Sequence, residues 1–534
     1  MYFLSKARNS HKSPKLQKGE KAYMKKLFKS MLIGIAAAFI LSFPAYAQLG
    51  DSAFFGGISE GRRLDKTTQL KINETKNKKQ EEYKAPYKEL IFLTGRPIEY
   101  NGLITKNSKE KIDIYDKTAK KADEYKLDYK FEISATTPQD VSVNRTIKYK
   151  VKYRIEDKQI IKDFETDDWD ETINAGGVTF TLDEDQSYSN VSVIEDYTPG
   201  VTYYKGNLSH RAVYTGQDGN TTLEMSGTFY GYTCAYSTTE TFRIDCTVSN
   251  GNWQMQYQLR PSVSVAKNLQ YTENEPTSIS FEGNYQDIMQ NKSGLSYNIY
   301  VKPPISYDIA DTRTVFIDTF NDFEQLPAID TGYVKGHFAE YDIKRMYAMQ
   351  ILTEDPKFYQ PDQAITRGQF VEMLVRAIKL PVENTQTKSK SKKAAVNLVF
   401  PDVLPERDDY KYIMAAYRSD LAVGRSNGHF YIDSPIERQE AIVILLRTLG
   451  LETLGLEPTS MTAFTDNSKI ASWAKKEVYA ANKLGIVAGD EDGNFRPTDF
   501  VSKAEAAALV NRLNQYMRED LQTDYTENIV NYAD

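Results

Sequence analysis

The chain has 534 residues, with 67 Lys and Arg against 73 Asp and Glu, and a net charge of −6. An acidic chain is a poor candidate for binding nucleic acid or an anionic membrane surface, so we exclude both as partners. At this length we expect two or three domains with ample core.

Residues 1–47 have the pattern of a secretory signal peptide. Lysines at 25, 26 and 29 precede an apolar run at 31–43, and the small-x-small triplet at 45–47 resembles a signal peptidase site. The apolar run is too short for a comfortable membrane span, so a retained anchor is the less favoured alternative. We therefore expect an exported protein with no integral membrane segment.

Cleavage after the triplet makes Gln48 the first residue of the mature chain, and Met24 is an alternative translation start. The leader carries nine basic residues and one acidic residue, so its removal brings the net charge near −14. Attraction to an anionic polymer must then come from local basic sites.

Residues 48–84 are polar and lysine-rich, whereas residues 85–302 have a strand-forming character. Val, Thr, Tyr and other strand formers alternate with polar residues at 146–154 and 178–182, which is the period of half-buried antiparallel strands. We therefore predict a mainly β region, an antiparallel sandwich or an open barrel, in one domain or two. Pro303-Pro304 marks its expected end.

Two cysteines, Cys234 and Cys246, lie in this β region on what the pattern predicts as neighbouring strands. An exported chain can keep a disulfide, and a hairpin would let the two face one another. The alternative is two free buried thiols, because the pairing depends on a strand register that sequence does not fix. No Cys or His neighbours supply the other ligands of a metal site.

Catalytic motifs are scarce, and we expect no cofactor and no metal. His210 is the one histidine of the β region, and its strand-like surroundings predict a surface residue. A short stretch around Trp169 is crowded with acids, namely Asp163, Glu165, Asp167, Asp168, Asp170 and Glu171. We interpret it as a solvated acidic loop, with a calcium site or a carboxylate pair for sugar hydrolysis as alternatives. Trp169 and the many tyrosines are either a glycan platform or good sheet formers.

The C-terminal third repeats one helix–turn–helix pattern three times, over residues 316–380, 396–452 and 460–517, before a polar tail at 518–534. Each copy opens on an aromatic-x-aspartate start and later begins a helix with a basic residue. The three aspartates are Asp322, Asp402 and Asp466, and the three cations are Arg367, Arg438 and Lys503.

A cation at a helix start is disfavoured by the helix dipole by roughly a few tenths of a kcal/mol, so local helix physics does not explain three of them. One interpretation is an anion site, built from exposed helix-start amides and a basic side chain. The other is a structural ion pair with Asp322, Asp402 or Asp466. Thr366 with Gln369, and Ser502 with Glu505, have the spacing of a capping box.

These marks resemble three tandem S-layer homology repeats. The third copy fits best, with Ser472-Trp473-Ala474 and the turn Asp492-Gly493-Asn494-Phe495-Arg496-Pro497, while the first lacks the glycine-rich turn. The resemblance implies an all-α pseudo-threefold helical bundle. It also implies binding of an anionic, often pyruvylated, secondary cell-wall polysaccharide between the copies.

Carried over by position, the resemblance assigns the cations Arg367, Arg438 and Lys503 to the acidic groups of the polymer. It places Asp322, Asp402, Asp466, Gly424 and Arg425 along the grooves. Trp473 either stacks on a sugar ring or anchors the helix in the core.

We therefore expect a non-catalytic surface protein of a bacterial cell wall or S-layer, which displays the β region and has the option of self-association in a surface array. The alternative is an anchored extracellular enzyme acting on polysaccharide or peptidoglycan, with its site in the β region.

Overall fold

A computed structural model of the chain describes residues 51–59, 79–110, 125–134, 141–156, 158–272, 284–304, 309–317, 321–382, 398–451 and 461–525. The predicted signal peptide and the last nine residues lie outside these ranges. None of the helices in the described ranges combines the length and apolarity needed to cross a membrane.

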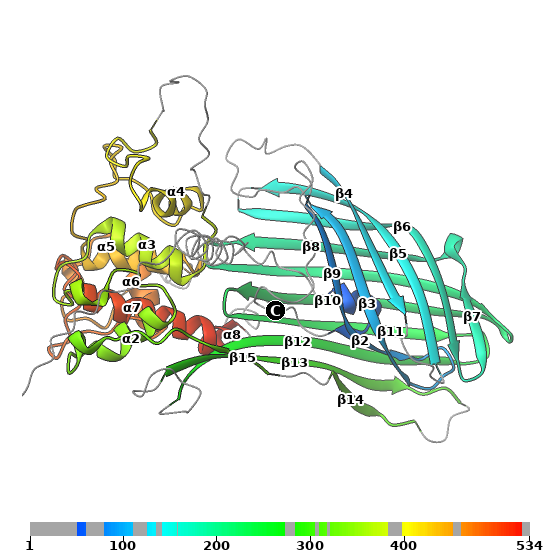
Figure 1. The fold of residues 1–534 in the computed structure, drawn as a ribbon. Helices are drawn as coiled ribbons and strands as arrows, with labels where there is room; N and C mark the ends of the chain where they lie inside the picture. Colours follow the sequence, from blue (N-terminus) through cyan, green and yellow to red (C-terminus); the bar gives the residue numbers. More distant parts are fainter. Residues whose placement is uncertain are drawn as a thin grey trace, which may run out of the picture. The chain divides into compact units, whose positions relative to one another are not determined.

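Fifteen strands form one antiparallel sheet, which curves strongly in Figure 1. They are β1 (Ile58–Ser59), β2 (Lys79–Ile91), β3 (Ile98–Glu110), β4 (Tyr125–Ser134), β5 (Val141–Glu156), β6 (Gln159–Ala175), β7 (Val178–Leu182), β8 (Tyr188–Tyr197), β9 (Val201–Gly216), β10 (Gly219–Cys234), β11 (Ser237–Ser249), β12 (Gln254–Thr272), β13 (Asn284–Val301), β14 (Thr312–Ile317) and β15 (Asp322–Gln325).

Strands that follow one another along the chain are neighbours in the sheet, as expected when short turns join antiparallel strands. Two places depart from this order: β8 pairs with both β6 and β9, and β15 pairs with β13 beside β14. Because all the described strands share one sheet, they do not form the two separate sheets that a sandwich requires. The sheet also runs past the predicted end at Pro303-Pro304, since β14 and β15 follow it.

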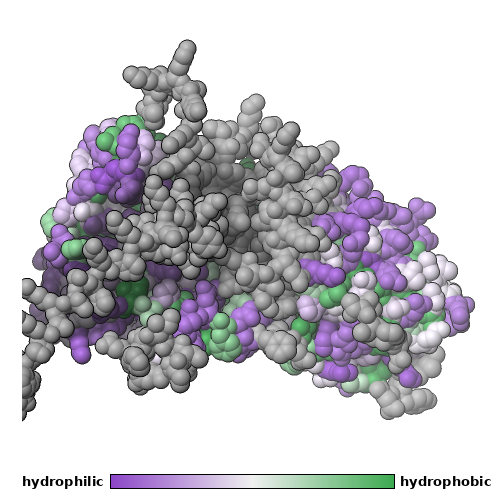
Figure 2. Space-filling view, viewed as in Figure 1, coloured by the Kyte–Doolittle hydropathy of each residue, from purple (hydrophilic) through white to green (hydrophobic). Residues whose placement is uncertain are grey.

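The alternation predicted for residues 146–154 and 178–182 is confirmed by β5 and β7. On β5, Ile147, Tyr149 and Val151 are buried while Lys148 and Lys150 face outward. One face of the sheet therefore carries the apolar core and the other the charged side chains. Figure 2 shows hydrophilic residues over much of the described surface on its visible face, with small hydrophobic areas between them.

The first described segment, residues 51–59, packs into the sheet core. Phe54 lies at the end of the 3-10 helix η1 (Asp51–Phe55) and is fully buried. Its ring contacts Phe131 on β4, Phe164 on β6 and Phe229 on β10, with centroids 6.5, 5.7 and 6.2 Å away. This segment belongs to the stretch predicted to be polar, 48–84, but its apolar residues fill the core between distant strands.

The sheet core also contains buried charges. Arg145 on β5 donates to Glu89 on β2 at 2.9 Å and to Glu171 on β6 at 2.6 Å. The indole N–H of Trp169 donates to Glu171 at 2.9 Å. Each carboxylate therefore has a cationic partner, which offsets part of the cost of burying it.

The disulfide predicted between Cys234 and Cys246 is wrong, because both thiols are free and buried. In the β10–β11 hairpin Thr233 pairs with Thr238, which places Cys234 beside the turn, whereas Cys246 pairs with Met225. Nine residues of strand separate Met225 from Cys234, or roughly 30 Å at about 3.3 Å per residue. The register therefore keeps the two thiols far apart, and the alternative of two free buried thiols is the correct one.

Short helices form the C-terminal region, mainly as three helix–turn–helix units. Their helices are η3 (Gly332–Val334), α2 (Glu340–Ala348), η4 (Pro356–Phe358), α3 (Arg367–Ala377), α4 (Tyr410–Arg418), α5 (Arg438–Arg447), η6 (Asn467–Lys469), α6 (Lys475–Lys483), α7 (Lys503–Gln515), the π-helical η7 (Tyr516–Asp520) and α8 (Leu521–Asp524). One further 3-10 turn, η2 (Glu184–Gln186), belongs to the sheet region.

The predicted polar tail is partly helical and packs on the sheet. Arg518 in η7 donates to Asp287 on β13 at 2.7 Å and to the carbonyl of Lys267 on β12 at 2.8 Å. Tyr525 is buried, and its hydroxyl donates to the carbonyl of Gly231 on β10 at 2.9 Å. Residues 518–525 therefore join the helical region to the sheet.

Candidate functional site

The segments that precede α3, α5 and α7 meet and hydrogen-bond in a cycle. Ile365 N–H donates to the Val501 carbonyl at 2.9 Å, Val501 N–H to the Ile436 carbonyl at 3.1 Å, and Ile436 N–H to the Ile365 carbonyl at 3.2 Å. All three side chains are buried. This cycle places the three basic helix starts in equivalent positions, each facing the next unit.

The first amide of each of these helices is already bonded within the protein. Arg367 N–H donates to Ser434, Arg438 N–H to Asp499 and Lys503 N–H to Gln363, at 2.8, 2.9 and 2.8 Å. In each case the accepting carbonyl belongs to the next unit in the cycle. The prediction of exposed helix-start amides as an anion site is therefore wrong, and any anion recognition falls to the side chains.

The predicted capping boxes are confirmed in α3 and α7. Thr366 and Ser502 accept from the amides of Gln369 and Glu505, whose side chains accept from the Thr366 and Ser502 amides in return. At α5 the amide of Glu437 donates to Glu440 at 3.4 Å. The third residues of α5 and α7, Glu440 and Glu505, thus lie beside Arg367 and Arg438 of the preceding units.

Three contacts between units repeat the same arrangement. We call them the first contact (Arg367 on the second unit), the second contact (Arg438 on the third unit) and the third contact (Lys503 on the first unit). In each, the cation lies over an aromatic ring of the next unit. The rings are Phe430, Phe495 and Tyr359, at 5.2, 5.5 and 5.4 Å from the cation. A cation over a ring face is held by the ring quadrupole.

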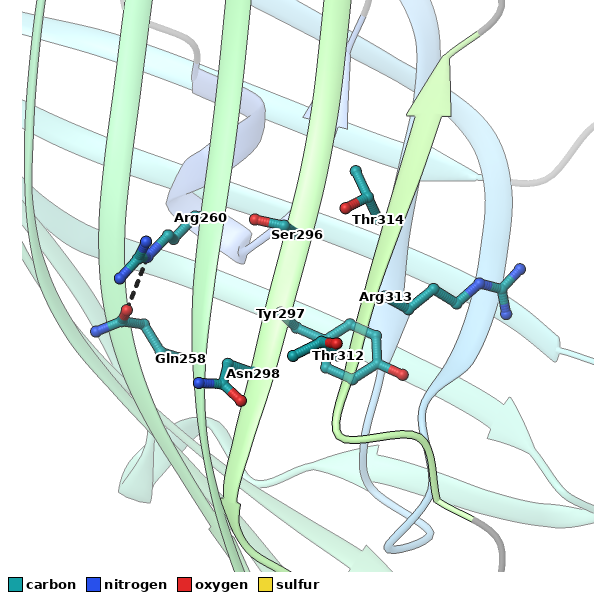
Figure 3. A pocket seen from close by; sticks show the side chains of 8 residues that line it. All are labelled: Gln258, Arg260, Ser296, Tyr297, Asn298, Thr312, Arg313 and Thr314. Carbon is teal, nitrogen blue, oxygen red and sulfur yellow. Dashed lines mark hydrogen bonds between the residues drawn. The ribbon is translucent and has the colours of Figure 1, made fainter.

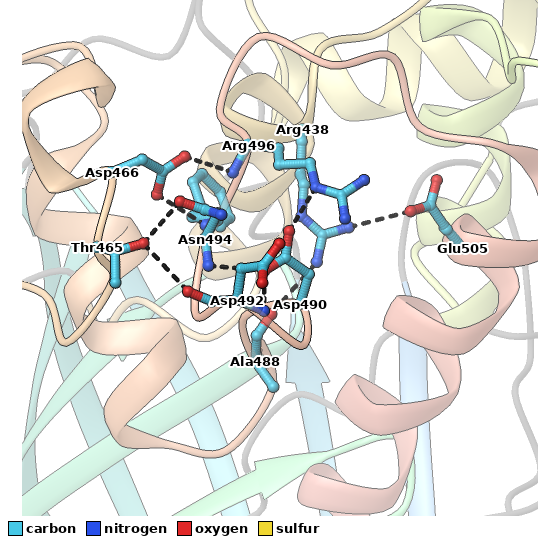
Figure 4. A network of polar contacts seen from close by, with 10 residues as sticks. Arg438, Thr465, Asp466, Ala488, Asp490, Asp492, Asn494, Arg496 and Glu505 are labelled. Carbon is cyan, nitrogen blue, oxygen red and sulfur yellow. Dashed lines mark hydrogen bonds and ion pairs between the residues drawn. The ribbon is translucent and has the colours of Figure 1, made fainter.

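At the second contact, Arg438 Nη1 lies 3.4 Å from Glu505 Oε1, and Nη2 donates to the Ala488 carbonyl at 3.5 Å (Figure 4). Burial lowers the pKa of Arg438 and Glu505 partly offsets this effect. An arginine remains charged in any case, so the site holds a partly desolvated cation.

At the first contact, two arginines share one carboxylate. Arg425 Nη2 donates to Glu440 Oε1 at 2.7 Å, and Arg367 Nη1 lies 3.7 Å from the same oxygen. Arg367 also donates to the Val423 carbonyl at 3.0 Å, and its Nε has no hydrogen-bond partner among the described residues. Burial lowers the pKa of Arg367. Among the described residues, this contact therefore brings two arginines to one carboxylate and keeps an excess of positive charge.

At the third contact, Lys503 Nζ lies 3.0 Å from both carboxylate oxygens of Glu354. Glu354 lies in the turn between α2 and η4. Lys503 is mostly buried, and Tyr359 donates to its backbone carbonyl at 3.0 Å. The ammonium is thus held by the Glu354 carboxylate and the Tyr359 ring of the protein itself.

Two of the predicted aspartates hold a turn of their own unit and do not pair with the helix-start cations. Asp466 accepts from the amides of Phe495 and Arg496, both at 2.8 Å, and Asp402 accepts from the amide of Phe430 at 2.9 Å. Each aspartate therefore positions the ring on which a cation rests. The ion-pair interpretation is right about internal pairing but wrong about the partners, which are glutamates.

Asp322 does not have this role. It lies on β15, where it pairs in register with Met289 of β13, outside the helical units. The predicted start of the first repeat at residue 316 thus falls on the sheet, and the first helical unit begins near η3.

Trp473 lies two residues before α6 and is 53% exposed. Phe338 has the same place before α2 and is 73% exposed. An anchor in the core would be buried, so that interpretation of Trp473 is wrong. Ala474, next to it, is fully buried and takes the core position instead.

The acidic stretch of the β region is a strand and not a loop. On β6, Asp168, Asp167 and Glu165 form ion pairs with Lys148, Lys150 and Lys152 of β5. Glu171 is buried against Arg145. A β-bulge in this pairing, where Lys148 faces Asp168 but Tyr149 faces Thr166, leaves both Asp167 and Asp168 on the outer face. These acids form a cross-strand charge ladder.

His210 and Trp169 are buried, so the prediction of a surface histidine is wrong, and of the two alternatives for Trp169 the glycan platform is excluded. The two rings pack edge to face at 4.9 Å. Burial and the nearby Arg145 lower the pKa of His210 to about 3. Among the described residues no group of three or more His, Cys, Asp or Glu is arranged to hold a metal ion.

A pocket of about 300 Å³ lies on β12, β13 and β14 (Figure 3). It is lined by Gln258, Arg260, Ser296, Tyr297, Asn298, Thr312, Arg313 and Thr314. None of these is a carboxylate, whereas glycoside hydrolysis commonly uses a pair of them. This pocket is therefore not arranged for that reaction.

The functional partners that sequence reasoning missed are the glutamates Glu440, Glu505 and Glu354. Glu440 and Glu505 occupy the third position of their helices, so an alignment of the three repeats would have pointed to both of these glutamates. Gln369 takes the equivalent place in α3. Glu354 lies in the turn of the unit that fitted the repeat pattern least well.

Residues 334–371, 399–442 and 463–507 match the S-layer homology domain, so the chain has three such domains in its C-terminal part. Among curated relatives, Exoglucanase XynX from Acetivibrio thermocellus is 31% identical over 153 residues, covering 28% of this chain and 13% of that protein. An endoglucanase from Bacillus sp. (strain KSM-635) is 26% identical, covering 32% and 17%. S-layer protein EA1 from Bacillus anthracis is 26% identical, covering 33% and 19%.

The chain thus spans less than one fifth of the length of each of these relatives. The glycosidases among them match only through the region of the three domains. Domains of this kind bind cell-wall polysaccharide in general, and together with the surface-protein relatives they give this chain an extracellular, wall-attached location.

Proposed function

We propose that this chain, with its three S-layer homology domains, is a non-catalytic surface protein that holds itself non-covalently to an anionic, pyruvylated wall polysaccharide. The sheet is the part that it displays.

The observation that carries this proposal is the arginine geometry of the first and second contacts. Arg438 and Arg425 are part-exposed, and each lies over an aromatic ring, Phe495 or Tyr431, at 5.5 or 4.9 Å. A guanidinium held in place loses little freedom when it binds a carboxylate, and its planar donors suit both carboxylate oxygens. Such a site can recognise the acid group of a sugar although the protein as a whole has a net negative charge.

Co-sedimentation of residues 48–534 with purified cell-wall sacculi tests the proposal. The wild type is expected to pellet with the sacculi, and the double variant Arg425→Ala/Arg438→Ala to lose at least about tenfold in affinity. A hydrogen bond to a charged group is worth about 1.5–3 kcal/mol, and 1.4 kcal/mol is tenfold in affinity.

The matched control is Arg154→Ala/Arg211→Ala, which removes the same charge from the outer face of the sheet, where these arginines pair with Glu156 and Glu224. Equal loss in both double variants would mean that only net charge matters. A wild-type chain that stays in the supernatant would refute wall anchoring.

The second candidate is an anchored enzyme, favoured by the glycosidases among the relatives. An assay of residues 48–534 for reducing sugar released from wall and plant glycans decides between the two. We expect no release, because Glu165, Asp167 and Asp168 are engaged with lysines and Glu171 with Arg145. Release that disappears in Asp167→Asn/Asp168→Asn/Asp170→Asn would establish the enzyme instead.

A further inference from the structure

The three contacts are equivalent by position but not by charge. A residue with positive φ follows the first helix of each unit. It is Gln350 after α2, Asp420 after α4 and Gly485 after α6. Three residues beyond it, Val423 and Ala488 accept from Arg367 and Arg438. Counting from these points therefore aligns the three turns.

Four and five residues beyond the positive-φ residue, the turns carry different charges. The second unit has Gly424-Arg425, the third has Gly489-Asp490, and the first has Glu354-Asp355. Arg496 neutralises Asp490 at 2.6 Å. The turn at the first contact thus presents a cation, Arg425, to solvent. The turn at the second contact adds almost no net charge beside Arg438, and the turn at the third contact presents two acids.

Glu354 occupies the third contact in the manner of a bound carboxylate. Both of its oxygens lie 3.0 Å from Lys503 Nζ, and its side chain is 35% exposed while that of Lys503 is 9% exposed. The accessible charge at this contact is therefore negative, which repels an acidic sugar.

The glutamates of the other two contacts are held differently. Glu505 uses one carboxylate oxygen to accept from the Ser502 amide at 2.8 Å, and only the other reaches Arg438, at 3.4 Å. Glu440 Oε1 is shared between Arg425 and Arg367. Each of these carboxylates therefore leaves guanidinium donors free for a ligand, because one guanidinium carries five N–H groups.

We infer that Glu354 is an internal carboxylate that closes the third contact, so that the chain takes two sugar acid groups, at Arg425 with Arg367 and at Arg438. This inference rests on the proposed wall anchoring and adds which contacts take part. The same charge pattern makes the first contact the tighter site, because Arg367 and Arg425 share Glu440 as their one carboxylate partner among the described residues.

The test is isothermal titration calorimetry of residues 48–534 with a monovalent probe, the methyl glycoside of a pyruvylated hexosamine. Three double variants each remove one cation and one carboxylate charge, so the net charge is constant. They are Lys503→Ala/Glu354→Ala for the third contact, Arg438→Ala/Glu505→Gln for the second and Arg425→Ala/Glu440→Gln for the first. Glutamine keeps the helix cap, because it serves at the third position of a capping box.

We expect two binding sites in the wild type and still two in Lys503→Ala/Glu354→Ala, with affinity unchanged within about twofold. Each of the other two variants should retain one site, and the remaining site should be weaker when the first contact is the one removed. Unchanged helical circular dichroism identifies a lost site as a binding effect.

Three sites in the wild type, or a site lost in Lys503→Ala/Glu354→Ala, would overturn the inference while leaving wall anchoring in place. Two sites retained in Arg438→Ala/Glu505→Gln would overturn the assignment of Arg438. A wild type that binds neither this probe nor sacculi would refute the proposed function itself.

Discussion

Arg145 on β5 lies 2.6 Å from Glu171 on β6, and both side chains are buried in the core of the sheet. Glu89 completes the group at 2.9 Å. A buried ion pair contributes little net stability, but removal of one partner leaves an uncompensated charge. The arginine stands between two carboxylates and offsets both.

Arg145→Ala should therefore lower the free energy of unfolding by about 3–5 kcal/mol, measured by chemical denaturation. The control is Arg154→Ala on the same strand, whose side chain is exposed and pairs with Glu156. An exposed pair is worth about 0–1 kcal/mol, so this variant should match the wild type. Similar values for the two variants would contradict the buried network.

His210 should make the sheet less stable in weak acid. Its pKa is lowered from 6.5 to about 3 by burial, so between these values the unfolded chain binds a proton that the folded chain does not. Stability is then lost as the pH falls below 6.5, by about 2 kcal/mol between pH 7 and pH 5. Denaturation of the wild type and of His210→Gln at both pH values measures the difference, and equal pH slopes would disprove this role.

The two cysteines should behave as inert free thiols. Burial raises the pKa of Cys234 and of Cys246, which suppresses the reactive thiolate. A thiol reagent should therefore react with the folded chain very slowly and with two equivalents after denaturation. An intact mass two hydrogens lower than that of the reduced chain would instead reveal a disulfide.

Asp466→Ala should weaken wall binding through the turn and not through loss of a ligand contact. Asp466 accepts two backbone amides and so holds Phe495, the ring beneath Arg438. Two unsatisfied amides cost about 1–3 kcal/mol each, so the melting temperature should fall together with sedimentation on sacculi. The control is Asp492→Ala, an exposed change in the same turn, which should alter neither the melting temperature nor sedimentation. If Asp466→Ala reduced binding at an unchanged melting temperature, Asp466 would contact the ligand directly.

The sequence was sufficient for features that depend on local spacing. Two-residue alternation located β5 and β7, and the Ser502–Glu505 and Thr366–Gln369 spacings located helix starts. The repeat pattern also placed Arg367, Arg438 and Lys503 in equivalent positions. The alternation and capping signals succeed because each depends on residues within about four positions of one another, and the repeat signal succeeds because one short pattern recurs three times.

Features that depend on register or on distant partners were not predictable in this way. The acids of β6 looked like a loop because the bulge at Asp167 shifts the alternation by one residue. The buried residues Phe164 and Trp169 are therefore five positions apart, which breaks the two-residue period of a strand. The cysteine pairing depended on where the β10–β11 turn falls. The glutamate partners of the three cations come from other units, and spacing within one repeat does not show which residues of two repeats meet.

The burial of Phe54 among β4, β6 and β10 has a consequence for how an exported chain acquires its structure. The contacts of this residue reach Phe229, and the neighbouring Gly56 lies against Leu259, about two hundred residues away in sequence. Contacts of such long range slow folding, because the intervening chain must be ordered first. The apolar residues of this segment can therefore be buried only once β10 and β12 are in place, and apolar surface that stays uncovered until then favours aggregation.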